Sequence, residues 1–143
     1  MNSAETPTDL THDEFVAAVE GCTLPNASFR HRDHLRLAWI YLQRLPFPQA
    51  TESMRRTVRR FAAHHGSSGK YHETLTLVWM RLLASAVDPR TPDGAFEELL
   101  ARKPEIVDTG LPLRFYSRER LFGPDARERF VEPDLMPLPP VPA

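Results

Sequence analysis

The chain has 143 residues, a length typical of one domain with its own hydrophobic core. Hydrophobic residues make up 41% and charged residues 26% of the sequence, as in ordinary globular proteins. The net charge of −1 argues against a protein that binds polyanions through general attraction, so we expect no nucleic-acid partner.

Three further features bear on the cellular compartment. The single cysteine, Cys22, cannot form an internal disulfide. The polar residues 1–10 contain no apolar segment of a signal peptide. The longest apolar run, residues 37–42, is far too short to span a membrane. We therefore expect a cytoplasmic protein with no membrane contact.

The first predicted element is a short helix over residues 12–20, which follows a flexible N-terminus over residues 1–10. Thr11 is a suitable N-cap, and Glu14 three residues later completes a capping box. Gly21 then ends the helix, as glycine commonly does.

Three longer helices are predicted next, over residues 29–45, 48–65 and 70–87. Ser28 is the expected N-cap of the first of them. Pro46 stops that helix, and Pro48 suits the first turn of the next one. A flexible turn, Gly66-Ser-Ser-Gly69, separates the second helix from the third. The four arginines between positions 55 and 60 are interpreted as a solvated face of the middle helix.

The C-terminal third is less periodic. Thr91 and Pro92 predict the start of a helix that continues to residue 102. Short helical segments are expected at residues 104–108, 117–121 and 124–130. The last eleven residues, 133–143, hold five prolines and should form an extended tail. The fold prediction is an all-α, single-domain bundle of about five main helices, spanning residues 11–132.

Histidines lead two of the long helices. His31 and His34 are three residues apart and therefore share a helix face with the apolar residues that follow. His72 opens a similar stripe that continues through Thr76 and Trp79. Two separate helices thus begin their buried faces with histidine, which is the main functional signal of the sequence.

Topology predicts that these histidines meet. If the three long helices run up, down and up, the first and third begin at the end where the second finishes. His31, His34 and His72 would then gather at one end of the bundle, together with His65 from the end of the middle helix.

The predicted site is a metal centre. Neutral imidazole is the commonest protein ligand for transition metals. His31, His34 and His72 would supply three ligands and leave positions open for water or substrate, as in catalytic sites. His65 is a candidate fourth ligand. The expected metal is a divalent transition metal, and spacing alone does not choose between Zn, Fe, Cu and Ni.

Residues around His72 complete the predicted site. Glu73 would be a fourth ligand or the general base, and Tyr71 a second catalytic residue. Lys70 and Thr76 would bind the substrate, with Lys70 suited to a carboxylate or phosphate. The positive ends of two helices oppose a bare cation there, but they keep the imidazoles neutral and favour an anionic substrate.

Three motifs give the chain a resemblance. They are F-x-H-x-x-H-L-x-x-A-W over residues 29–39, G-K-Y-H-E-T-x-T over residues 69–76, and Y-S-R-E-R-L over residues 116–121. In these motifs the chain resembles an uncharacterised family of small bacterial helical proteins. The resemblance implies that the three histidines belong to family motifs and that the C-terminal part belongs to the domain. It implies no activity.

The leading functional hypothesis is a metal-dependent enzyme that acts on a small molecule, which we expect to be anionic. Metal-activated water would give hydrolase or lyase chemistry, and iron or copper would instead give oxygenase chemistry. The alternative is a non-catalytic helical protein that binds a metal or small ligand as a sensor or carrier. A plain interaction module with hydrogen-bonded histidines is the third hypothesis. Formation of a homodimer is left open.

Overall fold

The computed structural model describes residues 7–87 and 96–142. These residues form seven α-helices, five of them with seven residues or more, and no strand, which confirms the all-α single-domain bundle. The helices are α1 (His12–Glu20), α2 (His31–Arg44), α3 (Phe47–His64), α4 (Glu73–Ala86), α5 (Phe96–Arg102), α6 (Arg118–Leu121) and α7 (Pro124–Glu128).

The start of α1 confirms the predicted capping box. The backbone N–H of Glu14 donates to Thr11 Oγ1 at 3.1 Å, and the N–H of Thr11 donates to Glu14 Oε1 at 2.9 Å. Two N–H groups that a helix start leaves free are thereby satisfied. Gly21 is the C-cap of the helix, also as predicted.

The start of α2 differs from the prediction. The N-cap is Arg30, not Ser28, because Ser28 belongs to a short 3-10 turn before the helix. The Asp33 carboxylate accepts the Arg30 N–H at 3.0 Å and fixes the first turn from inside the helix. The predicted Ser28 cap was therefore wrong by two residues.

The start of α4 also differs. The sequence predicts a helix from Lys70, whereas residues Ser68–Lys70 form a 3-10 turn and the α-helix begins at Glu73. His72 is the N-cap. Tyr71 and His72 therefore lie on extended backbone just before the helix, which changes the direction of both side chains.

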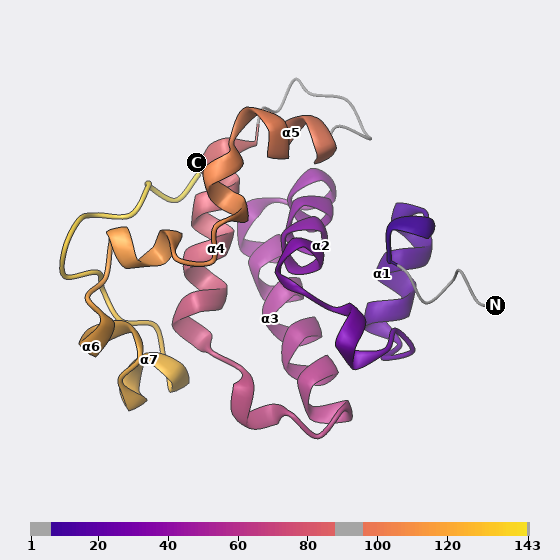
Figure 1. The fold of residues 1–143 in the computed structure, drawn as a ribbon, viewed down its shortest axis with the longest axis horizontal. Helices are drawn as coiled ribbons and strands as arrows, with labels where there is room; N and C mark the ends of the chain where they lie inside the picture. Colours follow the sequence, from indigo (N-terminus) through magenta and orange to yellow (C-terminus); the bar gives the residue numbers. More distant parts are fainter. Residues whose placement is uncertain (1–6, 88–95, 143) are drawn as a thin grey trace.

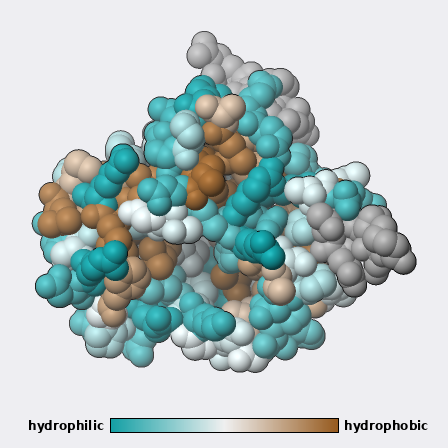
Figure 2. Space-filling view, in the orientation of Figure 1, coloured by the Kyte–Doolittle hydropathy of each residue, from teal (hydrophilic) through white to brown (hydrophobic). Residues whose placement is uncertain are grey.

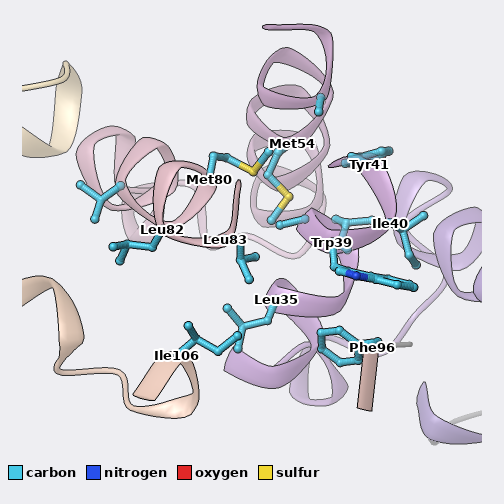
Figure 3. Packing of buried hydrophobic residues seen from close by; sticks show 14 of the residues in the cluster. Leu35, Trp39, Ile40, Tyr41, Met54, Met80, Leu82, Leu83, Phe96 and Ile106 are labelled. Carbon is cyan, nitrogen blue, oxygen red and sulfur yellow. The ribbon is translucent and has the colours of Figure 1, made fainter. Parts of the chain in front are cut away.

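The helices α2, α3 and α4 pack against one another in pairs and form the centre of the molecule. Figure 1 shows α3 descending to the turn before α4, and α4 returning alongside it. Between them the core is apolar: Figure 3 shows Met54 of α3 and Met80 of α4 pointing toward one another, near Leu83. All three side chains are at most 5% exposed.

The C-terminal segment packs against the beginning of α4. The Thr74 hydroxyl donates to the carbonyl of Arg129 at 2.9 Å, and Arg127 Nη1 donates to the carbonyl of Gly69 at 2.6 Å. The proline-rich tail is attached further on, where the N–H of Leu135 donates to the carbonyl of Phe115 at 2.9 Å. This segment therefore holds both the turn before α4 and its first turn.

The predicted short segments at 104–108, 117–121 and 124–130 correspond to a 3-10 turn (Pro104–Val107), to α6 and to α7. The predicted helix start at Thr91 and Pro92 lies outside the described residues. Apolar surface gathers in Figure 2 on the side where the C-terminal segment lies, and Phe122 and Leu135 in this segment are more than half exposed. None of the described helices has the length and apolar character needed to cross a bilayer.

Candidate functional site

A cavity of about 280 Å³ lies between α2, α3 and α4, and we refer to it as the first cavity. Its volume is just below the range that is typical of ligand pockets, about 300–1,000 Å³. Its apolar lining is Leu35, Ala38, Met54, Val58, Leu75, Trp79, Met80 and Leu83. Its polar lining is His31, His34, Lys70, Tyr71, His72 and Thr76. Six of the eight predicted site residues thus line one cavity.

One ring nitrogen of His31 forms a hydrogen bond to the backbone. Its Nε2 lies 3.0 Å from the carbonyl oxygen of Ile106. Because a carbonyl only accepts, Nε2 carries the proton, and Nδ1 keeps a lone pair. The ring packs against the edge of Trp79, with centroids 4.7 Å apart. His31 therefore brings one hydrogen-bond acceptor to the cavity wall.

His34 is arranged in the opposite tautomer. Its Nδ1 donates to the carbonyl of Arg30 at 2.9 Å, so Nε2 keeps the lone pair. The ring stacks on Phe29 with centroids 3.8 Å apart. Burial lowers the pKa of His34, and the hydrogen bond to Arg30 offsets only part of this decrease. His34 is therefore a neutral acceptor at physiological pH.

Both ring nitrogens of His72 form hydrogen bonds to the backbone. Its Nε2 donates to the carbonyl of Leu121 at 2.8 Å, and its Nδ1 accepts the N–H of Leu75 at 3.1 Å. The second bond is the N-cap of α4. Burial lowers the pKa of His72 and keeps the ring neutral, as both bonds require. Although His72 lines the cavity, its ring nitrogens are already paired.

The two hydrogen bonds of His72 argue against the predicted metal centre in its three-histidine form. In the described part of the chain, no three His, Cys, Asp or Glu side chains are grouped so that they could hold one metal ion. His31 and His34 each keep one lone pair, whereas His72 would have to release either Leu75 or Leu121 to act as a ligand. The residues as placed do not form a three-ligand set.

His65 lies outside the first cavity, with its ring next to that of His64 at a centroid distance of 4.9 Å. It is the C-cap of α3 and packs against Phe61, with ring centroids 4.4 Å apart. Its Nε2 is buried and has no hydrogen-bond partner among the described residues. The side chain is not among those that line the first cavity. The structure does not bring the predicted fourth ligand to the site.

Glu73 does not line the cavity and forms a partly buried network with Arg55 and Tyr71. Arg55 Nε donates to Glu73 Oε2 at 2.8 Å, and the Tyr71 hydroxyl donates to Glu73 Oε1 at 2.6 Å. Burial and the bond to Glu73 raise the pKa of Tyr71 to about 12. Glu73 therefore holds Tyr71 in the cavity wall as a protonated phenol, and both of its oxygens are used.

Thr76 and Lys70 have different roles at the wall. The Thr76 hydroxyl donates to the carbonyl of His72 at 2.9 Å, which leaves its lone pairs as acceptors. Lys70 is exposed and forms no ion pair with any described residue. Lys70 is therefore the cation of this wall that remains available to a ligand.

Two contributions to this site were missed by the sequence analysis. Arg55 was interpreted as part of a solvated arginine face, yet it pairs with the buried Glu73. Met54 belongs to the hydrophobic core, Val58 and Trp79 pack against that core, and all three also line a cavity. Helical periodicity identifies the inward face of each helix, but it does not show whether the space behind that face is filled.

Comparison with known proteins does not help to assign the site, because no family model, no curated protein and no solved structure matches the chain. The assignment of the site therefore depends on its own geometry.

Proposed function

We propose that the protein binds a small, mostly apolar organic molecule that carries a hydrogen-bond donor. The observation that carries the proposal is the first cavity, which is lined by eight apolar side chains together with His31 and His34, each of which keeps one ring nitrogen with a lone pair. Pockets for small molecules are typically of this kind, with an apolar lining and a few polar groups that fix orientation.

The polar groups indicate which kind of ligand fits. His31 Nδ1 and His34 Nε2 accept, because the other nitrogen of each ring already donates to a backbone carbonyl. A ligand O–H or N–H would satisfy them, whereas a purely apolar ligand would leave them unpaired. A neutral imidazole in an apolar pocket can also act as a general base toward such an O–H group.

The experiment compares two probes of nearly equal shape. Para-propylphenol has one O–H donor, and para-propylanisole has the same body without the donor. Binding is followed by NMR through the indole N–H of Trp79, identified with a Trp79→Phe variant. The chain's other tryptophan, Trp39, is 2% exposed and does not line the cavity, so its signal is an internal control.

We expect the phenol to shift the Trp79 signal and to bind about tenfold more tightly than the anisole, since an unpaired buried acceptor costs about 1–3 kcal/mol. If neither probe shifts this signal at millimolar concentration, the proposal fails. Equal affinity of the two probes would refute recognition by the histidines.

A metal-dependent enzyme is the second candidate. Its support is that His31 and His34 lie three residues apart on α2, line the same cavity and each keep one nitrogen lone pair. A third ligand would have to come from the bound molecule or from His72 after loss of its cap. Elemental analysis of protein purified without a histidine tag tests this: one equivalent of metal that a His34→Leu variant lacks would favour it.

A further inference from the structure

A second cavity adjoins the first. It has a volume of about 380 Å³, and it shares four lining residues with the first: His34, Val58, Lys70 and Tyr71. The two cavities therefore meet at one wall, and His34 and Lys70 are accessible from both sides. A ligand that occupied both cavities would pass these side chains.

The second cavity differs in its polar lining. Asn26, Ser67 and Lys70 supply an amide, a hydroxyl and an ammonium group, all of which can donate hydrogen bonds. The first cavity instead offers acceptors at His31 and His34. A ligand that spans the two would need a donor on its body and an acceptor at its end.

Among the Lys, Arg, Asp and Glu side chains of the described residues, only that of Lys70 lines the two cavities. No Asp or Glu among the described residues lines either cavity. The nearby Glu73 is neutralised by Arg55. The guanidinium of Arg59 lies over the Tyr71 ring, 5.3 Å from its centroid, and adds a second cation next to this residue of the shared wall. The starts of α2 and α4 contribute further partial positive charge.

We propose that the natural ligand is a small organic acid whose apolar, hydroxyl- or amino-bearing body lies in the first cavity and whose anionic group lies in the second, against Lys70. This inference rests on the proposed function and adds the chemical class of the ligand to it. The acid pairs with the one lysine that lines the cavities, and Ser67 and Asn26 solvate it. The donor on the body binds the histidines.

The test uses three probes with the same ring. Para-hydroxyphenylbutanoate carries the acid, para-hydroxyphenylbutanamide has the same length without charge, and para-propylphenol reaches only the first cavity. Affinities come from calorimetry at low salt. We expect the acid to bind at least about fivefold more tightly than the amide, as for a partly exposed ion pair. Raising the salt concentration should reduce this preference.

The variants have a matched control, because the chain has only two lysines and both are exposed. Lys70→Gln should lower the affinity for the acid to that for the amide, with an unchanged melting temperature. Lys103→Gln, which alters a lysine outside both cavities, should retain the preference. A preference that survives in Lys70→Gln would overturn the inference.

A second pair of variants tests the position of the acid. Ala62 lines only the second cavity, and the adjacent Ala63 lines neither. Ala62→Leu should weaken binding of the acid several-fold more than binding of para-propylphenol, and Ala63→Leu should not. If the phenol binds but the acid binds no better than the amide, this inference fails while the proposed function stands. If no probe binds, the proposed function fails as well.

Discussion

Both α2 and α4 begin beside histidines that line the first cavity, yet the two starts use them differently. His72 directs both ring nitrogens to backbone atoms, one in α4 and one in the C-terminal segment. His31 and His34 use one nitrogen each and keep an acceptor. The difference arises from position: His72 is the N-cap itself, whereas His31 and His34 lie within the first turn of their helix.

The comparison shows what a histidine at a helix start can do. An imidazole at the N-cap can accept the N–H of the residue three positions later, so it replaces the usual Ser or Asp. An imidazole inside the first turn cannot reach those N–H groups, and His34 instead donates back to the Arg30 carbonyl. The first arrangement stabilises the fold, and the second leaves an atom for a ligand.

The largest expected effect is on stability at the α4 start. His72→Ala removes the cap and leaves the buried Leu121 carbonyl unpaired. The free energy of unfolding should fall by about 3 kcal/mol, with about 1 from the cap and the remainder from the carbonyl. Urea denaturation measures this. His72→Asn, which retains an N-cap acceptor, should recover about 1 kcal/mol. A loss no larger than that of His34→Ala would contradict the assigned role of His72.

The next effect concerns the network behind the cavity wall. Glu73→Ala leaves the Arg55 guanidinium and the Tyr71 hydroxyl without their shared acceptor. We expect a loss of about 2 kcal/mol in the free energy of unfolding, less than for a fully buried pair because Arg55 is partly exposed and also contacts Glu52. Glu52→Ala is the control and should cost about 0.5 kcal/mol or less. Equal losses would show that Glu73 does not hold Tyr71.

A smaller decrease in the free energy of unfolding is expected when the pH is lowered. The pKa of His72 is lowered in the folded state, mainly by burial, so the unfolded chain binds this proton first as the pH falls. The stabilisation is complete above the ordinary histidine pKa of about 6.5 and decreases below it, by up to about 1.4 kcal/mol per pH unit for each proton. Urea midpoints at about pH 7.5 and about pH 5.5 measure the decrease.

The variant that isolates this proton is His72→Asn, whose decrease between the two pH values should be smaller than that of the wild type. His64→Asn, at an exposed position, should retain the wild-type decrease. If His72→Asn and the wild type lose stability equally, His72 is not the group responsible, and the partly exposed His34, whose pKa is also lowered, becomes the leading explanation.

The sequence contains enough to predict the bundle and the convergence of His31, His34 and His72 on one cavity. Helical periodicity, the Thr11–Glu14 capping box and the glycine and proline boundaries define the elements. Short connections then bring the starts of α2 and α4 together, and six predicted site residues line one cavity. These features depend on local spacing, which a single sequence displays.

The roles of the histidines could not be predicted in the same way. They depend on backbone carbonyls distant in sequence: Ile106 accepts from His31, and Leu121 accepts from His72. The pairing of Arg55 with Glu73 depends on the angle at which α3 and α4 pack. Spacing specifies which side chains face inward, but the atoms they meet there are determined by the packed fold.

The smallest expected effect on stability is at the start of α2. There the comparison of the two helix starts predicts a loss of ligand binding instead. His34→Leu removes one hydrogen bond to Arg30 and retains apolar packing on Phe29, so it should cost about 1 kcal/mol or less. The same change removes an acceptor from the first cavity and should abolish most of the preference for para-propylphenol over para-propylanisole. Calorimetry with both probes measures this.

The matched variant for His34→Leu is His72→Asn, which should be the less stable of the two yet keep the preference for the phenol. The reverse result, in which His72→Asn loses the preference and His34→Leu retains it, would mean that the ligand binds the α4 start. The ring of His72 would then have to leave Leu75 or Leu121 when the ligand enters, and the cap of α4 would be part of the binding site.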